Sequence, residues 1–466
     1  MKRILCFIIV FALLTPVTAY ANSGQKIWSG RTHQGIAVTD ENCPIAVEKE
    51  VLTLNIDSFP QMNYSGYDEL KGYNSTAVAE YTFINTSEYD TDSTRVFPLG
   101  NLPHYILIYE NEQTRDILPD SDKYSVAIDG KEIPHSIRYT FSPGKFDIKT
   151  EMAKIRDSYV QDSFFTPETT VVKYIYTTEN LGTEEDPWGE ISLMWKNKTD
   201  RTVLLPKEYN YFQAIGPDNA EIRTDLKSGE KYTVYTIGEK LTESPQVKTI
   251  SNNSDATVLL AETVDMTFEE FLFSEWEQYD ENRSISTTDW YNMYVDCFNR
   301  YMMDGKKLID SQSVRFSIQE DMMVWYQYDM HIPAGETLIN TVTVPLYPSM
   351  DYTYDPAVFG YTYHLSPAAT WADFGSIDIN IDTPFFITDS SIKLEKTGSG
   401  YSYSGDSLPK GELTFEMSEG ENPNKIRDNY GLLLISQLAA ISFFPPLALA
   451  AAVTALGFVV KKIFRL

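Results

Sequence analysis

The feature that most constrains this chain is an uncharged apolar segment near its C-terminus. Residues 430–460 contain no charged side chain, and the six residues that follow them, 461–466, are rich in Lys and Arg. A membrane-spanning helix needs roughly 20 apolar residues. We therefore predict a transmembrane helix over 430–460, with a kink at Pro445 and Pro446 because proline removes backbone donors. Cationic residues after a span favour the cytoplasmic side, so 461–466 are expected to form a short cytoplasmic tail.

A second, shorter apolar segment lies at the N-terminus. Lys2 and Arg3 precede an apolar run over 4–14, and an A-x-A sequence ends at Ala21. This order of basic, apolar and small residues is typical of a secretory signal peptide, which we assign to 1–21. The two segments together predict a single-pass protein of the cell membrane, with its N-terminal ectodomain outside the cell.

The region between the two segments is strongly acidic. The chain contains 66 Asp and Glu residues against 38 Lys and Arg, for a formal net charge of −28, and none of the acidic residues lies in the apolar segments. Nucleic acid is a poor partner for such a surface, because binding it depends on cationic side chains that neutralise phosphates. The expected partners are the membrane, through the span, and an envelope protein or a glycan.

Most of the ectodomain has the pattern of strands and turns. Short runs rich in Tyr, Thr, Val, Ile and Phe alternate with Gly, Pro, Asn and Asp,. Residues 324–332 alternate between an apolar face and a mostly polar face that includes Trp325, as in an antiparallel sheet over a core. Asp129 and Gly130 predict a tight hairpin, because both central positions of that turn favour positive φ. The predicted fold class is mainly β, with antiparallel β-sandwich-like domains.

Helical periodicity is concentrated in one part of the chain. Thr267 and Glu270 match a capping box at the start of a first helix,. A second helix is expected from about Thr288, with an apolar face that includes Trp290, and Gly305 is placed to end it. Aromatic residues at this spacing are more typical of a packed core than of a ligand groove. The sequence thus predicts a helical insertion between β-rich regions.

These patterns divide the chain into seven segments. They are a signal peptide at 1–21, a β-rich extracellular region at 22–262, a helical pair at 263–307, a β-sandwich-like extracellular domain at 308–417, a juxtamembrane linker at 418–429, the transmembrane helix at 430–460 and the tail at 461–466.

Motifs that carry chemistry are scarce. Cys43 and Cys297 remain after removal of the signal peptide and could pair in an oxidising compartment, although Cys297 on an apolar helix face equally suits a buried thiol. The five histidines match no zinc motif,. No G-x-S-x-G occurs, and we interpret 400–405 as a flexible turn. We therefore expect no cofactor, assign no metal ligand and no catalytic residue, and leave the disulfide open.

Three functions remain compatible with the sequence. The anchor, the strand pattern and the missing motifs favour a surface protein with a binding or envelope-scaffolding role. A membrane-tethered hydrolase of glycans or peptides would need two carboxylates about 5 to 10 Å apart in a pocket. A subunit of a transport or signalling assembly would use the kinked span as its contact.

Four short stretches resemble uncharacterised surface proteins of Gram-positive bacteria. They are Asn22-Ser23-Gly24, Glu41-Asn42-Cys43-Pro44-Ile45, Tyr363-His364-Leu365-Ser366-Pro367-Ala368 and Trp371-Ala372-Asp373-Phe374-Gly375. Proteins of this kind have an export signal, a β-rich ectodomain and one C-terminal span. The resemblance implies a bacterial cell-surface address, and it supplies no activity and no site residues.

Overall fold

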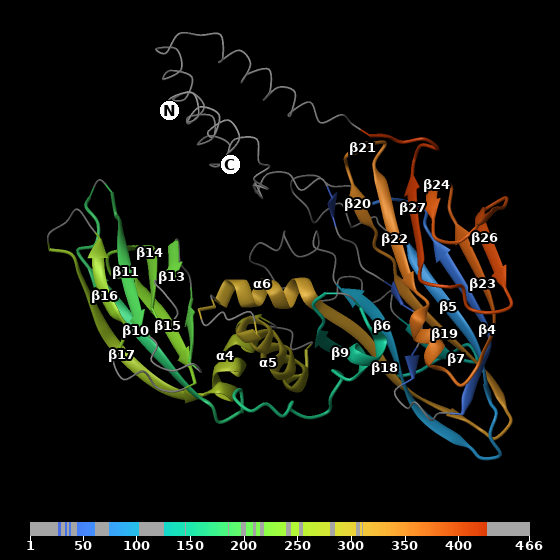
Figure 1. Ribbon diagram of the computed structural model, residues 1–466, viewed down its shortest axis with the longest axis horizontal. Coiled ribbons are helices and arrows are strands. Elements are labelled where there is room, and N and C mark those ends of the chain that lie inside the picture. The colour runs from blue at the N-terminus through green and yellow to red at the C-terminus, as the bar shows by residue number, and fades with distance from the viewer. Residues whose placement is uncertain are drawn as a thin grey trace, which may run out of the picture.

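The fold is that of a computed structural model (Figure 1). The structure describes residues 27–28, 33–34, 37–38, 44–60, 74–101, 125–144, 146–184, 186–196, 202–207, 211–214, 219–238, 244–250, 255–279, 285–303, 308–309 and 311–425. The predicted signal peptide, span and tail lie outside these residues. Among the helices that are described, none has the length and apolar character needed to cross a membrane. The described chain is mainly β and contains several antiparallel sheets, which confirms that part of the prediction.

A smaller lobe is built from one continuous stretch of the chain, 170–267. Its strands are β10 (Thr170–Glu179), β11 (Trp188–Lys196), β12 (Val203–Pro206), β13 (Tyr211–Ala214), β14 (Asn219–Lys227), β15 (Lys231–Ile237), β16 (Gln246–Ile250) and β17 (Thr257–Thr267). They form two four-stranded antiparallel sheets, ordered β12-β15-β10-β17 and β13-β14-β11-β16. Side chains from both sheets, including Leu193, Trp195 and Val234, share one apolar core. The core of this lobe therefore comes from residues that are close in sequence.

A larger lobe combines strands from before and after that stretch. They are β1 (Ile27–Trp28), β2 (His33–Gln34), β3 (Ala37–Val38), β4 (Ile45–Asn55), β5 (Thr76–Asn85), β6 (Thr91–Asn101), β7 (Ser125–Ile128), β8 (Lys131–Glu132), β9 (Ser136–Phe141), β18 (Met322–Ile332), β19 (Thr337–Pro345), β20 (Ser349–Asp351), β21 (Tyr354–Asp355), β22 (Val358–His364), β23 (Phe374–Asp382), β24 (Phe386–Ser390), β25 (Glu395–Lys396), β26 (Gly400–Gly405), β27 (Leu413–Ser418) and β28 (Asn424–Lys425).

The larger lobe has two layers. One is an eight-stranded sheet in the order β25-β26-β23-β4-β5-β19-β7-β8. The other contains the sheets β1-β20-β22-β27-β24 and β3-β6-β18-β9. Tyr81 in β5 and Tyr363 in β22 join the layers through their hydroxyl groups, 3.2 Å apart. Most strand pairs are antiparallel, but β4 and β23 run parallel, so strands from the two ends of the described chain lie side by side.

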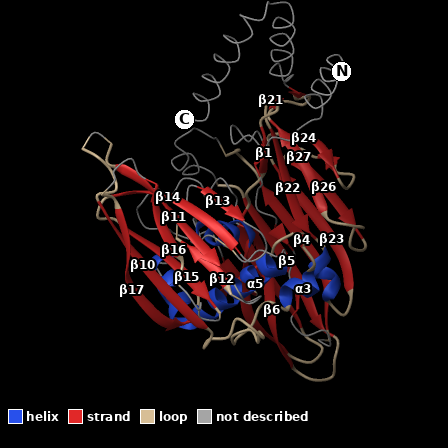
Figure 2. Cartoon of the chain, turned by 60° about the vertical axis from the view of Figure 1, so that its left-hand side comes forward, coloured by secondary structure: helices blue, strands red, loops and turns tan. Residues whose placement is uncertain are grey.

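Three helices lie between the two lobes (Figures 1 and 2). They are α4 (Phe268–Tyr279), α5 (Thr287–Met303) and α6 (Ser311–Asp321), while the short α3 (Ile148–Met152) and the 3-10 helix η3 (Ser366–Thr370) belong to the larger lobe. The predicted capping box starts α4: the Thr267 amide donates to Glu270 Oε2 at 2.8 Å, and the Glu270 amide donates to Thr267 Oγ1 at 3.1 Å. A continuous apolar core connects these helices to both lobes.

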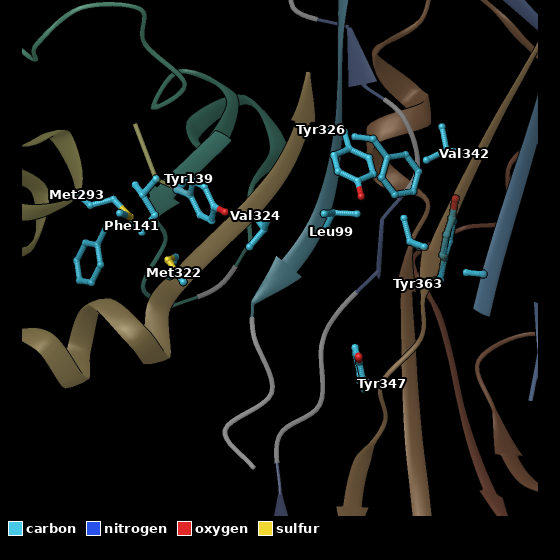
Figure 3. Close-up of a cluster of buried hydrophobic side chains, with 14 of the residues drawn as sticks. Leu99, Tyr139, Phe141, Met293, Met322, Val324, Tyr326, Val342, Tyr347 and Tyr363 are labelled. Atoms are coloured by element: carbon cyan, nitrogen blue, oxygen red, sulfur yellow. The ribbon is translucent and has the colours of Figure 1, made fainter. Parts of the chain in front are cut away.

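Helix α5 is the centre of this junction. Its buried residues face several directions, as expected for a helix that other elements cover on most sides,. Met293 of α5 contacts the same core as Tyr139 and Phe141 of β9 and Met322 of β18, and this core continues across the larger lobe to Tyr363 (Figure 3). Phe268, Phe271, Trp290, Tyr294 and Phe298 of the predicted helical pair are buried in this core.

The structure differs from the sequence interpretation at three places, and two of them lie between 308 and 325. The region from 308 was expected to begin a β-rich domain, but α6 precedes the first strand. Only Ser311, Val314 and Ile318 of α6 are buried, so its apolar periodicity is weak. Trp325 was placed on the wetter face of its strand, yet it is fully buried and packs in a small separate cluster with Ile148 of α3. Strand β18 is covered on both faces there, which an alternating pattern alone does not reveal.

The predicted hairpin is present. Asp129 and Gly130 join β7 to β8 with φ of 48° and 75°. A residue with a β-carbon is strained at positive φ, and glycine is not. By contrast, the stretch at 400–405, interpreted as a flexible turn, is strand β26, which pairs with β23 along its whole length.

Candidate functional site

A pocket of about 770 Å³ opens at one end of the larger lobe. Strands β4 and β23 both end at it, because they run parallel and pair Asn55 with Asp382 at their last residues. Strands β5 and β26 begin at it, and the turn between β25 and β26 closes one side. The pocket thus lies where the loops of four neighbouring strands converge.

The backbone around the pocket is fixed by hydrogen bonds. The Ile56 amide donates to the Asp382 carbonyl at 2.9 Å, and the Thr383 amide donates to the Ser399 carbonyl at 3.0 Å. Gly400 permits this close approach, since a β-carbon there would lie 2.0 Å from the Ile381 carbonyl oxygen,. The turn can therefore rest directly against the end of β23.

Polar side chains line several sides of the pocket. Asp57 and Asp382 are both exposed. Asp382 Oδ1 accepts a hydrogen bond from the Ser399 hydroxyl at 3.1 Å. Asn55 Nδ2 donates to Thr76 Oγ1 at 3.3 Å. A carboxylate has several acceptor positions and an amide has both donors and acceptors. The pocket can therefore exchange hydrogen bonds with a ligand that carries several hydroxyl groups.

Aromatic rings form an apolar wall. Phe385 stacks on Phe59 with ring centroids 4.1 Å apart, and Phe59 stacks on Phe359 of β22 at 3.9 Å. This row of rings ties the pocket to the facing sheet. Phe386 is half-buried, and the Lys396 ammonium lies 5.4 Å from its ring centroid. A pocket with a rigid aromatic wall and a few placed polar groups is the usual architecture of a small-ligand site.

A different carboxyl group has an altered pKa. Glu50 of β4 is fully buried between the two layers, and this burial raises its pKa to about 7. The Tyr363 hydroxyl donates to Glu50 Oε1 at 3.3 Å. Within the described residues, Glu50 Oε2 has no hydrogen-bond partner. Glu50 does not line the pocket. Because solvent does not reach it, we assign it to the core and not to the site.

Of the residues singled out from the sequence, Gly400 and Tyr401 of the stretch 400–405 line the pocket, whereas Cys297 and His364 lie away from it. Cys297 is fully buried in α5 and forms no disulfide among the described residues, and burial raises the pKa of its thiol to about 12. Cys43 lies outside the described residues, so the disulfide stays a prediction. His364 Nδ1 lies 3.3 Å from Glu412 Oε1. Partial burial opposes ionisation of Glu412, but the contact with His364 and hydrogen bonding from Ser366 lower its pKa to about 2. The described part of the chain brings together no group of three or more His, Cys, Asp or Glu that could hold a metal ion.

No motif in the sequence identifies the carboxylates and the aromatic wall of the pocket as a site. Asp57 and Asp382 are two among many acidic residues, and they are far apart in the chain. Phe386 follows Pro384 in a segment with no recognisable motif. Only the parallel pairing of β4 with β23 brings these positions together, and no local pattern predicts it.

Comparisons with known proteins add little. No family model matches the chain, and no curated protein matches it. Among solved structures, it is similar to a Legionella pneumophila protein described as a "putative nutrient binding protein", with 9% identity over 84% of this chain and 72% of that one, at a TM-score of 0.33. A similarity this low supports no conclusion about function.

Proposed function

We propose that this chain is a membrane-anchored extracellular binding protein, and that its pocket takes a ligand of the saccharide class. The observation that supports it is the pairing of an aromatic wall, at Phe386, with the hydrogen-bonding groups of Asp57, Asp382 and Asn55 in one pocket. The flat apolar face of a sugar ring fits against an aromatic ring, while its hydroxyls need both donors and acceptors.

The volume and the charge of the pocket restrict the class of ligand that it can bind. A volume of about 770 Å³ lies within the roughly 300 to 1,000 Å³ typical of small-molecule sites,. Two carboxylates line the pocket against one lysine, Lys396. An anionic ligand would therefore be repelled, so we favour a neutral saccharide over a phosphorylated or acidic one.

The proposal is tested by measuring binding of neutral mono- and oligosaccharides to the full-length chain in detergent, by calorimetry or on a glycan array. Phe386→Ala and Asp382→Asn should each weaken binding by about fivefold to about a hundredfold, since each removes contacts worth about 1 to 3 kcal/mol. Asp389→Asn is a matched control, because Asp389 is an exposed residue of β24 outside the pocket. Binding that neither variant changes, or no binding of any saccharide, would overturn the proposal.

A hydrolase is the second candidate, because Asp57 and Asp382 line the same pocket. Glycoside hydrolysis generally needs one carboxyl held protonated as the general acid, and burial is the usual means of raising its pKa. Both pocket carboxylates are exposed, which favours binding over catalysis. Incubating the chain with the oligosaccharides it binds and analysing the products by mass spectrometry separates the two. Cleavage that Asp57→Asn and Asp382→Asn each abolish would establish the hydrolase.

A further inference from the structure

The chain leaves the larger lobe at the end where the pocket lies. Strand β27 ends at Ser418, and Ser418 pairs with Phe386, the first residue of β24 and part of the pocket wall. The strand therefore runs toward the pocket end of the lobe and stops beside it.

The last described strand is held at the same end. Strand β28 pairs with β21, matching Lys425 with Tyr354 and Asn424 with Asp355. Strand β21 lies in the connection from β20 to β22, close to Phe359, whose ring stacks on Phe59 beside the pocket. Figure 1 shows β21 at the upper end of the larger lobe, together with β24 and β27. The chain is thus fixed to this end as far as Lys425.

The distance from Lys425 to the predicted span is short. The span is expected to begin at 430, five residues later, and an extended residue covers at most about 3.6 Å, so the connection cannot exceed about 18 Å. The strands of the lobe are longer: β4 and β18 have 11 residues each, which is about 36 Å at about 3.3 Å per residue,. The connection therefore keeps the pocket end of the lobe within about 18 Å of the start of the span, which is half the length of the lobe,.

We infer that the pocket opens beside the membrane surface and that its ligand is the sugar headgroup of a neutral glycolipid in the same membrane. This inference rests on the proposed function, which supplies the ligand class, and on the predicted span. Phospholipid headgroups with net negative charge are disfavoured by Asp57 and Asp382,. A headgroup presented within about 18 Å of the lobe needs no diffusion from solution, so even a weak pocket would be occupied.

Orientation is tested first, with the full-length chain in phosphatidylcholine nanodiscs that contain nitroxide-headgroup lipid. A fluorophore is placed on Gly398→Cys at the pocket rim, where a β-carbon meets open space. In a second protein it is placed on Glu336→Cys, an exposed position between β18 and β19 at the opposite end of the lobe, where the Glu336 carbonyl accepts from the Asn85 amide at the last residue of β5. A Cys43→Ser background avoids labelling Cys43, and Cys297 is buried. Strong quenching at 398 and little at 336 is expected. Equal quenching, or stronger quenching at 336, overturns the inference.

Ligand class is tested with the unlabelled chain. The chain is reconstituted in phosphatidylcholine nanodiscs that contain either a neutral diglucosyl-diacylglycerol or phosphatidylglycerol. The lipid that the chain retains after purification is then measured by mass spectrometry. We expect the glycolipid to be retained, and Asp382→Asn to reduce its retention at least fivefold while Asp389→Asn does not. Retention of phosphatidylglycerol, or of no lipid, overturns the inference. If soluble saccharides still bind, the proposed function survives that failure; if no saccharide binds in any form, both fail.

Discussion

The two lobes of this protein reach similar architectures by opposite routes. The smaller lobe takes all its strands from 170–267, and its core is an apolar cluster around residues such as Leu193 and Val234. The larger lobe joins strands from both sides of that stretch, and its core buries the ionisable residues Glu50 and Arg95. Arg95 lies 4.6 Å over the ring of Trp371, which partly compensates its burial,.

This difference shows where the chain can hold a ligand site. A lobe closed by local pairing can form its core without distant contacts, which favours rapid folding. A lobe closed by distant strands, such as β4 and β23, brings together loops that are unrelated in sequence. The pocket lies at such a meeting point. If the two cores are independent, a substitution in the core of one lobe should leave the other lobe and the pocket intact.

The largest effect is expected from Leu193→Ala in the smaller lobe. Leu193 is fully buried in a cluster that does not include the larger lobe. Removing its side chain should lower the free energy of unfolding by about 2 to 5 kcal/mol, through lost transfer energy and a cavity. Denaturant titration measures this, and saccharide binding should stay unchanged under native conditions. A variant that loses binding while folded would contradict the separation of the lobes.

The next largest effect concerns the junction between β9 and α5. Arg138 Nη2 lies 3.0 Å from Asp289 Oδ1, and Asp289 also accepts a hydrogen bond from the Tyr139 amide at 3.1 Å. Asp289→Ala leaves a largely buried guanidinium without its main partner. It should therefore lower the free energy of unfolding by about 3 kcal/mol. This is near the lower limit for breaking a buried ion pair, because Asp157 and Gln327 still contact Arg138. The free energy of unfolding is the measurement.

Asp289→Asn is the matched control for this junction. The amide oxygen can still accept from Arg138 or from Tyr139, so the loss should be clearly smaller than with alanine. Equal losses for both variants would show that the charge of Asp289, and not its hydrogen bonding, holds the helix to the larger lobe.

Glu50→Gln should sharpen the contrast between the two cores through its pH dependence. The folded pKa of Glu50 is about 7 against an ordinary value of 4.5. The folded state therefore binds more protons than the unfolded state between these values, so wild-type stability falls as pH rises from about 4.5 through about 7. Over this whole pH range, the free energy of unfolding falls by about 3 kcal/mol. Gln stays neutral, and it keeps an acceptor for the Tyr363 hydroxyl.

The measurement is denaturant unfolding of both proteins at pH 4.5 and pH 8. The stability difference between Glu50→Gln and wild type should be small at pH 4.5, and at pH 8 the variant should be more stable by up to about 3 kcal/mol. A difference that does not change with pH would mean that Glu50 is not the titrating group of this core.

The smallest effect is expected at the boundary between the smaller lobe and the helices. Thr267→Ala removes the acceptor of the Glu270 amide at the start of α4. The loss should be about 1 kcal/mol, as for other N-cap residues. Thr267→Ser keeps the hydroxyl and should lose much less. A large loss with serine would point to the methyl group rather than to the cap.

Local signals in the sequence predicted a substantial part of this fold. The strand composition predicted a mainly β chain, Asp129 and Gly130 predicted a hairpin, and Thr267 with Glu270 predicted the start of α4. Each of these features depends on a few neighbouring residues, whose backbone preferences act over one turn or one strand. The helix α6 and the two-sided burial of Trp325 were not predicted, because tertiary contacts and not local periodicity determine them.

Local patterns in the sequence are thus enough to predict the kinds of elements and some of their boundaries, and they predict an exported, anchored chain. That Asp57 and Phe386 share a pocket, that Glu50 lies between two sheets and that Ser418 ends beside the pocket is visible only in the folded chain. These features could not be predicted because convergence and burial depend on pairing between distant strands. That pairing is set by the packing of the whole core, and no short segment records it.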